Sequence, residues 1–332
     1  MGERTEAQAY LQRLAGEVEA GLAACLGELP AEPAVLYGPV RYVLEGGGKR
    51  IRPVLVLLAA EAFGGEAARR RALPAALAVE VFHNFTLVHD DIMDGAAERR
   101  GRPTVHVRWD AGTAILSGDL LMGLSYDLLA RVEGADTAAL VRRFHAMVLR
   151  LCEGQALDAA FERRDGVTVA DYLDMIERKT GALLEAALEI GGIVGGAGEA
   201  GRAALRTAGR ELGRAFQIQD DLLDLTAESD GWGKTIGGDL VAGKRTFLLL
   251  RALERAGGDE RAWFARALDG GLPAAEVAEA RARMDRLGVL DDARAAVRRH
   301  SDAGLAALAA LPPGPAADAL RSLAERLVRR AH

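Results

Sequence analysis

The sequence contains few residues of several kinds, and each shortage excludes a class of protein. Only two of the 332 residues are cysteines, Cys25 and Cys152, and no CxxC pair is present, so neither a disulfide framework nor a zinc site is expected. Apolar runs such as residues 54–60 are far shorter than the ~18 to 20 residues that cross a bilayer. The N-terminus, MGERTEAQAYLQRL, is polar and acidic, whereas a secretory signal begins with basic residues before an apolar stretch. We therefore expect a protein of a reducing compartment, the cytoplasm, without a transmembrane segment.

Lysine is scarce as well. Only four of the 42 basic residues are lysines, and the 48 acidic residues give a formal net charge of −6, so nucleic acid is not expected as a partner. Arginine serves as well as lysine on most solvated surfaces, but it does not replace a compact ammonium group at a tight anionic site. The lysines that remain are therefore candidates for anion binding: Lys49, Lys179, Lys234 and Lys244.

Alternation of apolar and polar residues with period two is missing, whereas apolar residues recur three and four positions apart in almost every long segment. This pattern predicts an all-α fold, with helices over residues 5–27, 33–45, 51–63, 72–94, 112–131, 135–164, 169–192, 199–226, 238–254, 260–269, 274–286, 290–309 and 315–330. Segments 72–94 and 199–226 are apolar around much of their circumference, which predicts central helices. No linker or repeat divides the chain, so we predict a single domain over residues 1–332.

Two acidic clusters have identical spacing. The first central segment ends in HDDIMD and the second contains QDDLLD, so Asp-Asp-x-x-Asp occurs twice. Residues four apart lie on one helix face, and carboxylate ligands suit Mg²⁺, which binds a few carboxylates together with substrate phosphates. Solvated helix ends are the alternative, but lone carboxylates on apolar helices are costly. We predict that several Mg²⁺ ions and a diphosphate bind at Asp90, Asp91, Asp94, Asp220, Asp221 and Asp224.

Basic residues accompany these clusters. EGGGKRIRP places Lys49, Arg50 and Arg52 after three glycines, and ERRGRPT places Arg99 and Arg100 a short loop beyond the first cluster. Glycines let backbone amides approach an anion, and the cations neutralise it. A solvated basic turn and simple pairing with the nearby acids are the respective alternatives. Neither GGGKR nor GWGKT has the spacing of a P-loop, which excludes an NTPase.

The inventory lacks a candidate Ser, Cys or His nucleophile. Carboxylates suited to Mg²⁺ and several cations indicate a reaction whose main demand is stabilisation of a departing diphosphate. An allylic carbon that loses diphosphate leaves a carbocation, which an alkene can attack.

Six motifs, in this order and spacing, resemble the trans-isoprenyl diphosphate synthase (polyprenyl synthetase) family: GGGKRIRP, HNFTLVHDDIMD, RRGRPT, KTG, AFQIQDDLLD and GKTIGGDLVAGKRT. The resemblance implies an all-α bundle of the isoprenoid synthase type around a deep central cavity. It also implies a homodimer and the Mg²⁺-dependent head-to-tail condensation of isopentenyl diphosphate with an allylic diphosphate.

The resemblance further implies roles for individual residues. The isopentenyl diphosphate site corresponds to Lys49, Arg52, His83 and Arg100, and the metal ligands correspond to the six aspartates. The groups that hold the allylic diphosphate correspond to Arg99, Lys179, Thr180, Gln217, Lys234 and Lys244, of which all but Arg99 are predicted to be catalytic. A structural histidine on a core helix is the alternative for His83. Gln155 and Asp158 resemble a polar pair that the family places near the cavity.

Product length is expected to depend on the residues that precede the first cluster. Phe82, Phe85 and Thr86 occupy about one helix face, and bulky side chains there would form the floor of the cavity. This favours a short product, geranylgeranyl diphosphate first and farnesyl diphosphate next. The alternative is that both phenylalanines only pack against neighbouring helices.

Other functions remain open on the sequence alone. A longer-chain polyprenyl diphosphate synthase would usually have small residues at the floor. A class I terpene cyclase normally mixes Asn or Asp with Ser or Thr and Glu in its second metal motif, and a noncatalytic partner subunit would be expected to have lost an aspartate or the GGGKR segment. A helical Mg²⁺ phosphohydrolase would need an activated water instead of an apolar tunnel.

Overall fold

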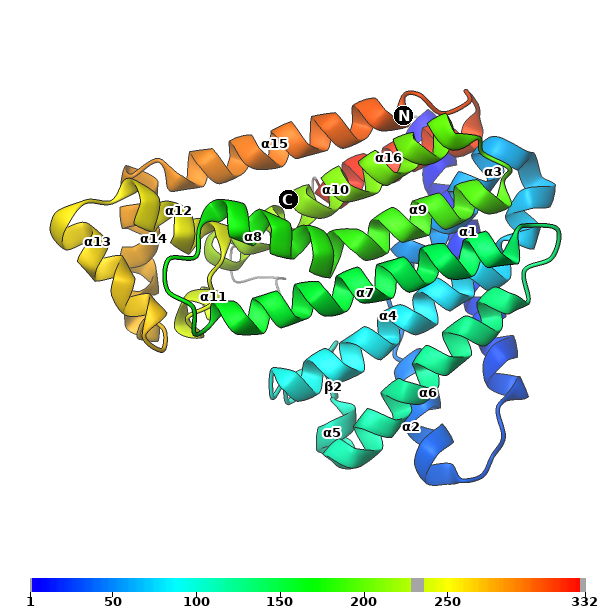
Figure 1. The fold of residues 1–332 in the computed structure, drawn as a ribbon, viewed down its shortest axis with the longest axis horizontal. Helices are drawn as coiled ribbons and strands as arrows, with labels where there is room; N and C mark the ends of the chain where they lie inside the picture. The colour runs from blue at the N-terminus through cyan, green and yellow to red at the C-terminus, as the bar shows by residue number, and fades with distance from the viewer. Residues whose placement is uncertain (1, 228–235, 329–332) are drawn as a thin grey trace. The chain divides into compact units, whose positions relative to one another are not determined.

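The computed structural model describes residues 2–227 and 236–328 (Figure 1). The predicted all-α fold is confirmed, since the described residues add only a hairpin of two short strands, β1 (Glu98–Arg99) and β2 (Arg102–Pro103). Contacts between Cα atoms divide the chain into two compact units. Each unit joins segments that are distant in sequence, and the single domain stays a prediction.

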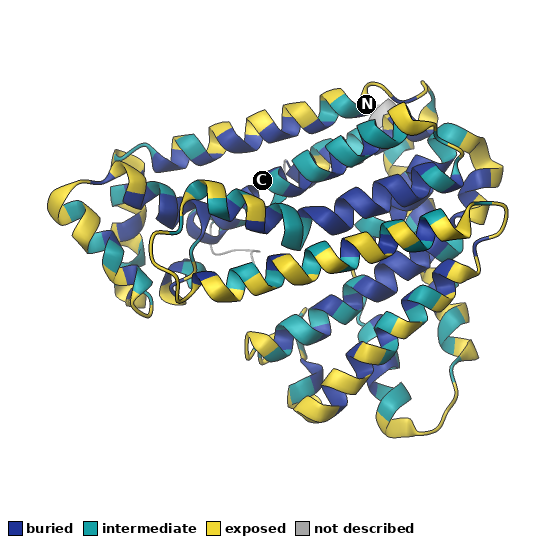
Figure 2. Cartoon of the chain, in the orientation of Figure 1, coloured by how far each residue is buried: buried dark blue, intermediate teal, exposed yellow. Residues whose placement is uncertain are grey.

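The first unit holds the described residues within 1–145, 186–205 and 311–320. Its complete helices are α1 (Gly2–Glu28), α2 (Ala34–Leu44), α3 (Ile51–Arg71), α4 (Leu73–Met93), α5 (Val105–Arg108) and α6 (Ala111–Ala130). Helix α4 packs against α1, α2, α3 and α6. No residue of α4 before Met93 is exposed (Figure 2), which confirms that this segment is a central helix.

The second unit holds the described residues within 146–185, 206–310 and 321–332. Its complete helices are α8 (Val169–Ile176), α11 (Gly238–Val241), α12 (Phe247–Arg255), α13 (Gly258–Ala265), α14 (Val277–Arg286) and α15 (Val289–Leu308). Short 3₁₀ turns lie at Arg266–Leu268 and Ala274–Glu276. Helix α12 packs against α8, α13 and α15.

Four helices contribute residues to both units: α7 (Thr137–Phe161), α9 (Ala182–Val194), α10 (Glu199–Thr226) and α16 (Pro315–Val328). No residue of α10 between Gly201 and Thr226 is exposed, which confirms the second predicted central helix. Among the described residues, no helix combines the length and the apolar composition needed to span a bilayer.

Two predicted helices are interrupted. The segment predicted as 238–254 breaks after α11, because Gly243 has a left-handed φ of 69° and the Thr246 side chain caps the start of α12. The segment predicted as 169–192 contains a turn of π-helix, Glu177–Gly181, between α8 and α9. We call these five residues the π-turn. A π-turn inserts one residue without breaking the helix, so the spacing of apolar residues gave no sign of it.

Candidate functional site

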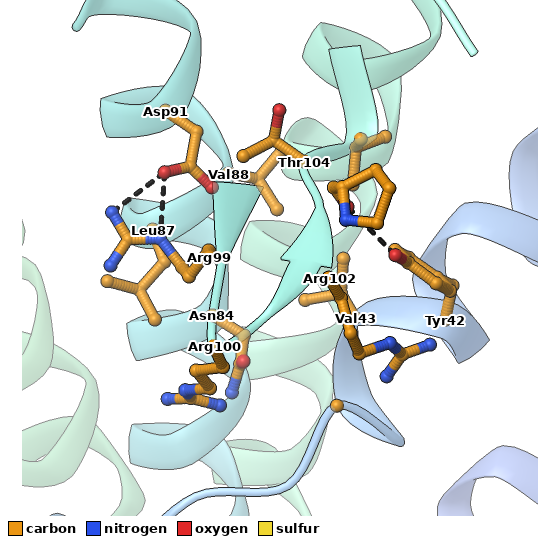
Figure 3. A pocket seen from close by; sticks show the side chains of 13 residues that line it. Tyr42, Val43, Asn84, Leu87, Val88, Asp91, Arg99, Arg100, Arg102 and Thr104 are labelled. Atoms are coloured by element: carbon orange, nitrogen blue, oxygen red, sulfur yellow. Dashed lines mark hydrogen bonds and ion pairs between the residues drawn. The ribbon is translucent and has the colours of Figure 1, made fainter. Parts of the chain in front are cut away.

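The first acidic cluster lies at the C-terminal end of α4. Asp90 and Asp91 lie in its last turn, and the backbone N–H of Asp94, the residue that caps the helix, donates to the Asp90 carbonyl at 2.8 Å. Asp90 is half-buried and Asp94 is exposed, but Asp91 is buried. Nε and one terminal nitrogen of Arg99 both lie 2.7 Å from Oδ1 of Asp91 (Figure 3). Burial raises the pKa of Asp91, and the Arg99 guanidinium opposes that rise.

The β1–β2 hairpin places the two arginines that follow this cluster. Its two-residue turn is Arg100–Gly101, and both residues have left-handed φ angles, 54° and 70°, as the favoured hairpin turns require. Arg99 pairs with Asp91, as the simple alternative held. Arg100 instead donates a hydrogen bond to the carbonyl of Gly47 in the glycine-rich segment.

The glycine-rich segment connects α2 to α3 with an unusual backbone. Gly47 and Gly48 have φ angles of 71° and 152°, and Arg50 is also left-handed at 46°. A Cβ atom on Gly48 would lie 3.2 to 3.3 Å from the Arg100 guanidinium. Glycine at this position therefore lets Arg100 lie close against the segment that carries Lys49.

Arg50 is an anchor for this segment. Its side chain is 1% exposed, with Nε 2.7 Å from Glu19 and a terminal nitrogen 2.6 Å from Glu80. It also donates to the carbonyl of Leu44 at 3.1 Å. Arg50 is therefore committed to the core, although the sequence grouped it with the anion-binding cations. Glu80 was missed, and its signal is an acidic residue inside an apolar helix, three positions before His83.

His83 lies among positively charged side chains. Its Nε2 lies 3.2 Å from a terminal nitrogen of Arg52. Burial first, and then the charges of Arg52, Arg100 and Arg99, hold the pKa of His83 well below its ordinary value. The imidazole is therefore neutral at pH 7. Because these guanidiniums lie close enough to disfavour a further cation, this part of the unit suits an anion.

A small cavity lies between the hairpin and α4 (Figure 3). Its volume is about 50 Å³, which holds only a few water molecules. Asp91, Arg99 and Arg100 line it together with apolar side chains of α2 and α4. The Tyr42 hydroxyl donates to the carbonyl of Pro103 at 2.8 Å across it. The cavity is too small for a prenyl diphosphate.

The second acidic cluster is on α10, in the second unit. Asp221 is buried, and its carboxylate accepts hydrogen bonds from the Tyr172 hydroxyl at 2.6 Å, the Phe247 N–H at 3.1 Å and the Gln217 amide at 3.2 Å. Burial, and second the charge of Asp239, raise the pKa of Asp221 to about 7.

Two of the predicted catalytic residues, Thr180 and Gln217, connect to this carboxylate. The Thr180 hydroxyl donates to the carbonyl oxygen of the Gln217 side chain at 3.0 Å. Gln217 therefore connects Thr180 to Asp221. Lys179 Nζ lies 2.5 Å from Asp158, so the structure also brings one of the two polar residues of CEGQALD to the KTG motif.

The third aspartate of the cluster connects to the segment after α10. The N–H of Asp239 donates to Asp224 at 3.2 Å, and Lys244 Nζ lies 3.8 Å from Asp239. Asp220 is half-buried on the same helix. Lys234, the remaining predicted cation, lies outside the described residues. Tyr172 and Asp239 were missed, because a tyrosine and an aspartate in ordinary helical segments carry no spacing signal.

The carboxylates fit a divalent cation chemically. Their oxygen atoms are the hard ligands that Mg²⁺ prefers, and the raised pKa of Asp221 reflects its burial and the negative charge of Asp239 beside it. Within residues 2–227 and 236–328, no group of three or more His, Cys, Asp or Glu side chains is arranged to hold a metal ion.

Fold and geometry define a helical protein in which the first unit combines an acidic cluster with several guanidiniums and the second unit holds a carboxylate-rich region. The polyprenyl synthetase family model matches residues 33–283. The geranylgeranyl diphosphate synthase of Methanosarcina mazei is 45% identical over 225 residues, 67% of this chain and 69% of that protein. The geranylfarnesyl diphosphate synthase of Natronomonas pharaonis is 39% identical over 324 residues, 92% of this chain and 93% of that protein.

A solved structure is similar over nearly the whole chain. The geranylgeranyl pyrophosphate synthetase from Pyrococcus horikoshii OT3 aligns with a TM-score of 0.91 and 37% identity, covering 98% of this chain and 99% of that one. The chain therefore belongs to the polyprenyl synthetase family, and it is a prenyltransferase.

Asp221 should make the stability of the metal-free protein depend on pH. Its folded pKa of about 7 lies above its ordinary value of 3.8, so the folded state binds the proton more tightly. The resulting stabilisation is complete below pH about 4 and is lost as the pH rises to about 7. In urea unfolding with EDTA, the unfolding free energy of the wild type minus that of Asp221→Asn should fall across this window. If this difference in unfolding free energy does not change with pH, it contradicts the raised pKa of Asp221.

Proposed function

We propose that the protein condenses isopentenyl diphosphate with allylic diphosphates in the presence of Mg²⁺ and releases a short-chain trans-prenyl diphosphate. The family and the names of two similar proteins, a geranylgeranyl and a geranylfarnesyl diphosphate synthase, support this reaction. The observation that carries the proposal is that one chain contains both a group of guanidiniums suited to an anion and a buried carboxylate suited to a cation. Guanidiniums gather around a neutral histidine, and a buried carboxylate whose pKa is raised lies on a helix that repeats the Asp-Asp-x-x-Asp spacing.

In this proposal the first unit binds isopentenyl diphosphate through Lys49, Arg52, His83 and Arg100. The supporting geometry is the contact of Arg52 with His83 and of Arg100 with the glycine-rich segment. Guanidiniums bind diphosphate oxygens in a forked geometry. Neutral His83 can donate one hydrogen bond without adding charge.

The allylic diphosphate would be held by the two aspartate clusters through Mg²⁺, and by Arg99, Lys179, Thr180, Gln217, Lys234 and Lys244. Mg²⁺, when bound, neutralises the charge that builds on the departing diphosphate. Lys179 and Lys244 add fixed positive charge for the same oxygens. The hydroxyl group of Thr180 and the side-chain carbonyl group of Gln217 are dipoles that can stabilise a positively charged allylic carbon. The hydrogen bond between them fixes their positions.

The six aspartates differ in their exposure to solvent. Asp91 is bonded to Arg99, and Asp221 accepts three hydrogen bonds from protein donors. Asp90, Asp94 and Asp220 are half-buried or exposed on the helix surface. We propose that all six aspartates supply charge to the metal sites, that the more accessible Asp90, Asp94 and Asp220 lie nearest the ions, and that Asp91 and Asp221 also orient Arg99 and Gln217.

Chain length would be limited by the phenylalanines of α4. The ring of Phe82 is fully buried, with its centroid 5.2 Å from the ring centroids of both Phe85 and Phe144. Phe85 is partly exposed and rests on Phe82, while Thr86 donates its hydroxyl to the carbonyl of His83. Phe85 is thus the aromatic ring of α4 that a growing chain would meet, and Phe82 supports it. This arrangement favours geranylgeranyl diphosphate over longer products.

We also propose that the protein is a cytoplasmic homodimer. The exposed apolar side chains of Ile115 and Leu116 on α6, 46% and 60% exposed, support an interface on this helix. Farnesyl diphosphate is the next candidate product, and the name of one relative adds geranylfarnesyl diphosphate as a longer alternative.

Incubation with isopentenyl diphosphate and each allylic primer in Mg²⁺ tests the reaction. The wild type should extend the primers, and Asp90→Ala and Asp220→Ala should each lower kcat about 10²- to 10³-fold, because each removes charge that stabilises the departing diphosphate. Asp302→Ala, an exposed aspartate of α15, is the matched control and should keep the wild-type rate. Release of a cyclic hydrocarbon, hydrolysis alone or no reaction by the wild type would each contradict the proposal.

Phe85→Ala should shift the products toward longer chains, because it lowers the floor while Phe82 keeps the core filled. Radiolabelled product analysis measures the shift. Phe63→Ala on α3, whose ring packs near Gly201, is the control and should leave the product distribution unchanged. An unchanged distribution in Phe85→Ala rejects Phe85 as the floor.

A further inference from the structure

The π-turn carries two of the residues proposed to hold the allylic diphosphate, Lys179 and Thr180. A π-helical turn contains one residue more than an α-helical turn, so it changes which side chains face the neighbouring helices. Lys179 and Thr180 contact Asp158 and Gln217 in the carboxylate-rich region. The first residue of the π-turn, Glu177, makes different contacts.

Glu177 binds two helices with one carboxylate. Its Oε1 lies 2.5 Å from a terminal nitrogen of Arg150 on α7, and its Oε2 accepts a hydrogen bond from Arg214 on α10. The side chain of Glu177 is 16% exposed. Arg150 also lies 3.0 Å from a carboxylate oxygen of Glu185, and Arg214 lies 3.3 Å from one of Glu211. Because the carboxylates of these ion pairs are mostly buried, the pairs are less screened than surface pairs and can hold the backbone that carries Glu177.

Helices α7 and α10 also approach the backbone of the π-turn closely, each through a glycine. A Cβ atom on Gly154 of α7 would lie 2.3 Å from the nitrogen of Lys179, and one on Gly213 of α10 would lie 2.6 Å from Cα of Gly181. Gly154 follows Arg150 by four residues and therefore shares its helix face. Gly213 is adjacent to Arg214. Each helix thus supplies a seat for the π-turn and a cation for Glu177.

We propose that Glu177 is a positioning residue. Held between Arg150 and Arg214, it fixes the π-turn on Gly154 and Gly213, so that Lys179 and Thr180 keep their places at the allylic diphosphate. The consequence for the reaction rests on the proposed function. The structural consequence, a π-turn that loosens when the carboxylate charge is lost, does not.

Glu177→Gln tests the proposal because it keeps the size of the side chain and removes its charge. The kcat of chain extension should fall about 10- to 100-fold, because small displacements of groups that position the substrate lower the rate by such factors. The KM for isopentenyl diphosphate should not change, because the residues proposed to bind it belong to the first unit. Glu153→Gln is the matched control: Glu153 also joins α7 to the π-turn, 2.6 Å from Arg178, but it is 53% exposed. It should keep kcat within about twofold of the wild type.

Hydrogen exchange gives a readout that does not depend on activity. The backbone amides of residues 178–181 should exchange faster in Glu177→Gln and at the wild-type rate in Glu153→Gln. Unchanged exchange in Glu177→Gln, a wild-type kcat, or equal losses in both glutamine variants would overturn the proposal. If the wild type itself extends no chains, the proposed function fails and the exchange experiment alone decides the role of Glu177.

Gly154→Ala provides a second route that leaves Glu177 intact. The new methyl group would displace the π-turn, so the loss of kcat and the faster exchange should recur. Gly16→Ala on α1, where no atom lies within 4 Å of the new Cβ, controls for the substitution itself. A Gly154→Ala protein with wild-type kcat and exchange contradicts the proposed seat.

Discussion

A buried carboxylate whose hydrogen-bond partners are all neutral dominates the second unit. Tyr172, Gln217 and the backbone N–H of Phe247 satisfy the oxygen atoms of Asp221, but none of them supplies a positive charge. Burial therefore leaves its pKa near 7, with Asp239 adding to the repulsion. A divalent cation near Asp221 would offset this electrostatic cost. In the first unit, guanidiniums near His83 suppress its protonation.

Both regions contain ion pairs between residues to which no substrate contact is assigned. Arg50 ties the glycine-rich segment to Glu19 and Glu80. Glu177 does the same for the π-turn. In each case a charged side chain that binds no ligand fixes the backbone beside residues that are proposed to bind one. Enzymes that work by electrostatic stabilisation require such preorganisation, because groups that are already in place need not reorganise during the reaction.

The sequence predicted the helices and the acidic and basic clusters, because helical periodicity and motif spacing are local properties. It did not predict the hairpin that directs Arg99 to Asp91 and Arg100 to Gly47. The two left-handed residues in RRGR leave no periodic signal in the sequence. It grouped Arg50 with the ligand-binding cations, because the Glu80 that buries it lies 30 residues away. The π-turn was read as continuous helix for the same reason: the glycines and arginines that hold it belong to α7 and α10.

A double-mutant cycle for Asp90 and Asp220 tests the central claim that both acidic clusters act on one metal-bound diphosphate. Calorimetry would measure the Mg²⁺-dependent binding of inorganic diphosphate to the wild type, Asp90→Ala, Asp220→Ala and the double variant. We predict that the double variant loses less affinity than the sum of the single variants, with a coupling energy on the order of 1 to 3 kcal/mol. Losses that add within about 0.5 kcal/mol would mean that the two clusters act independently, and they would contradict the account.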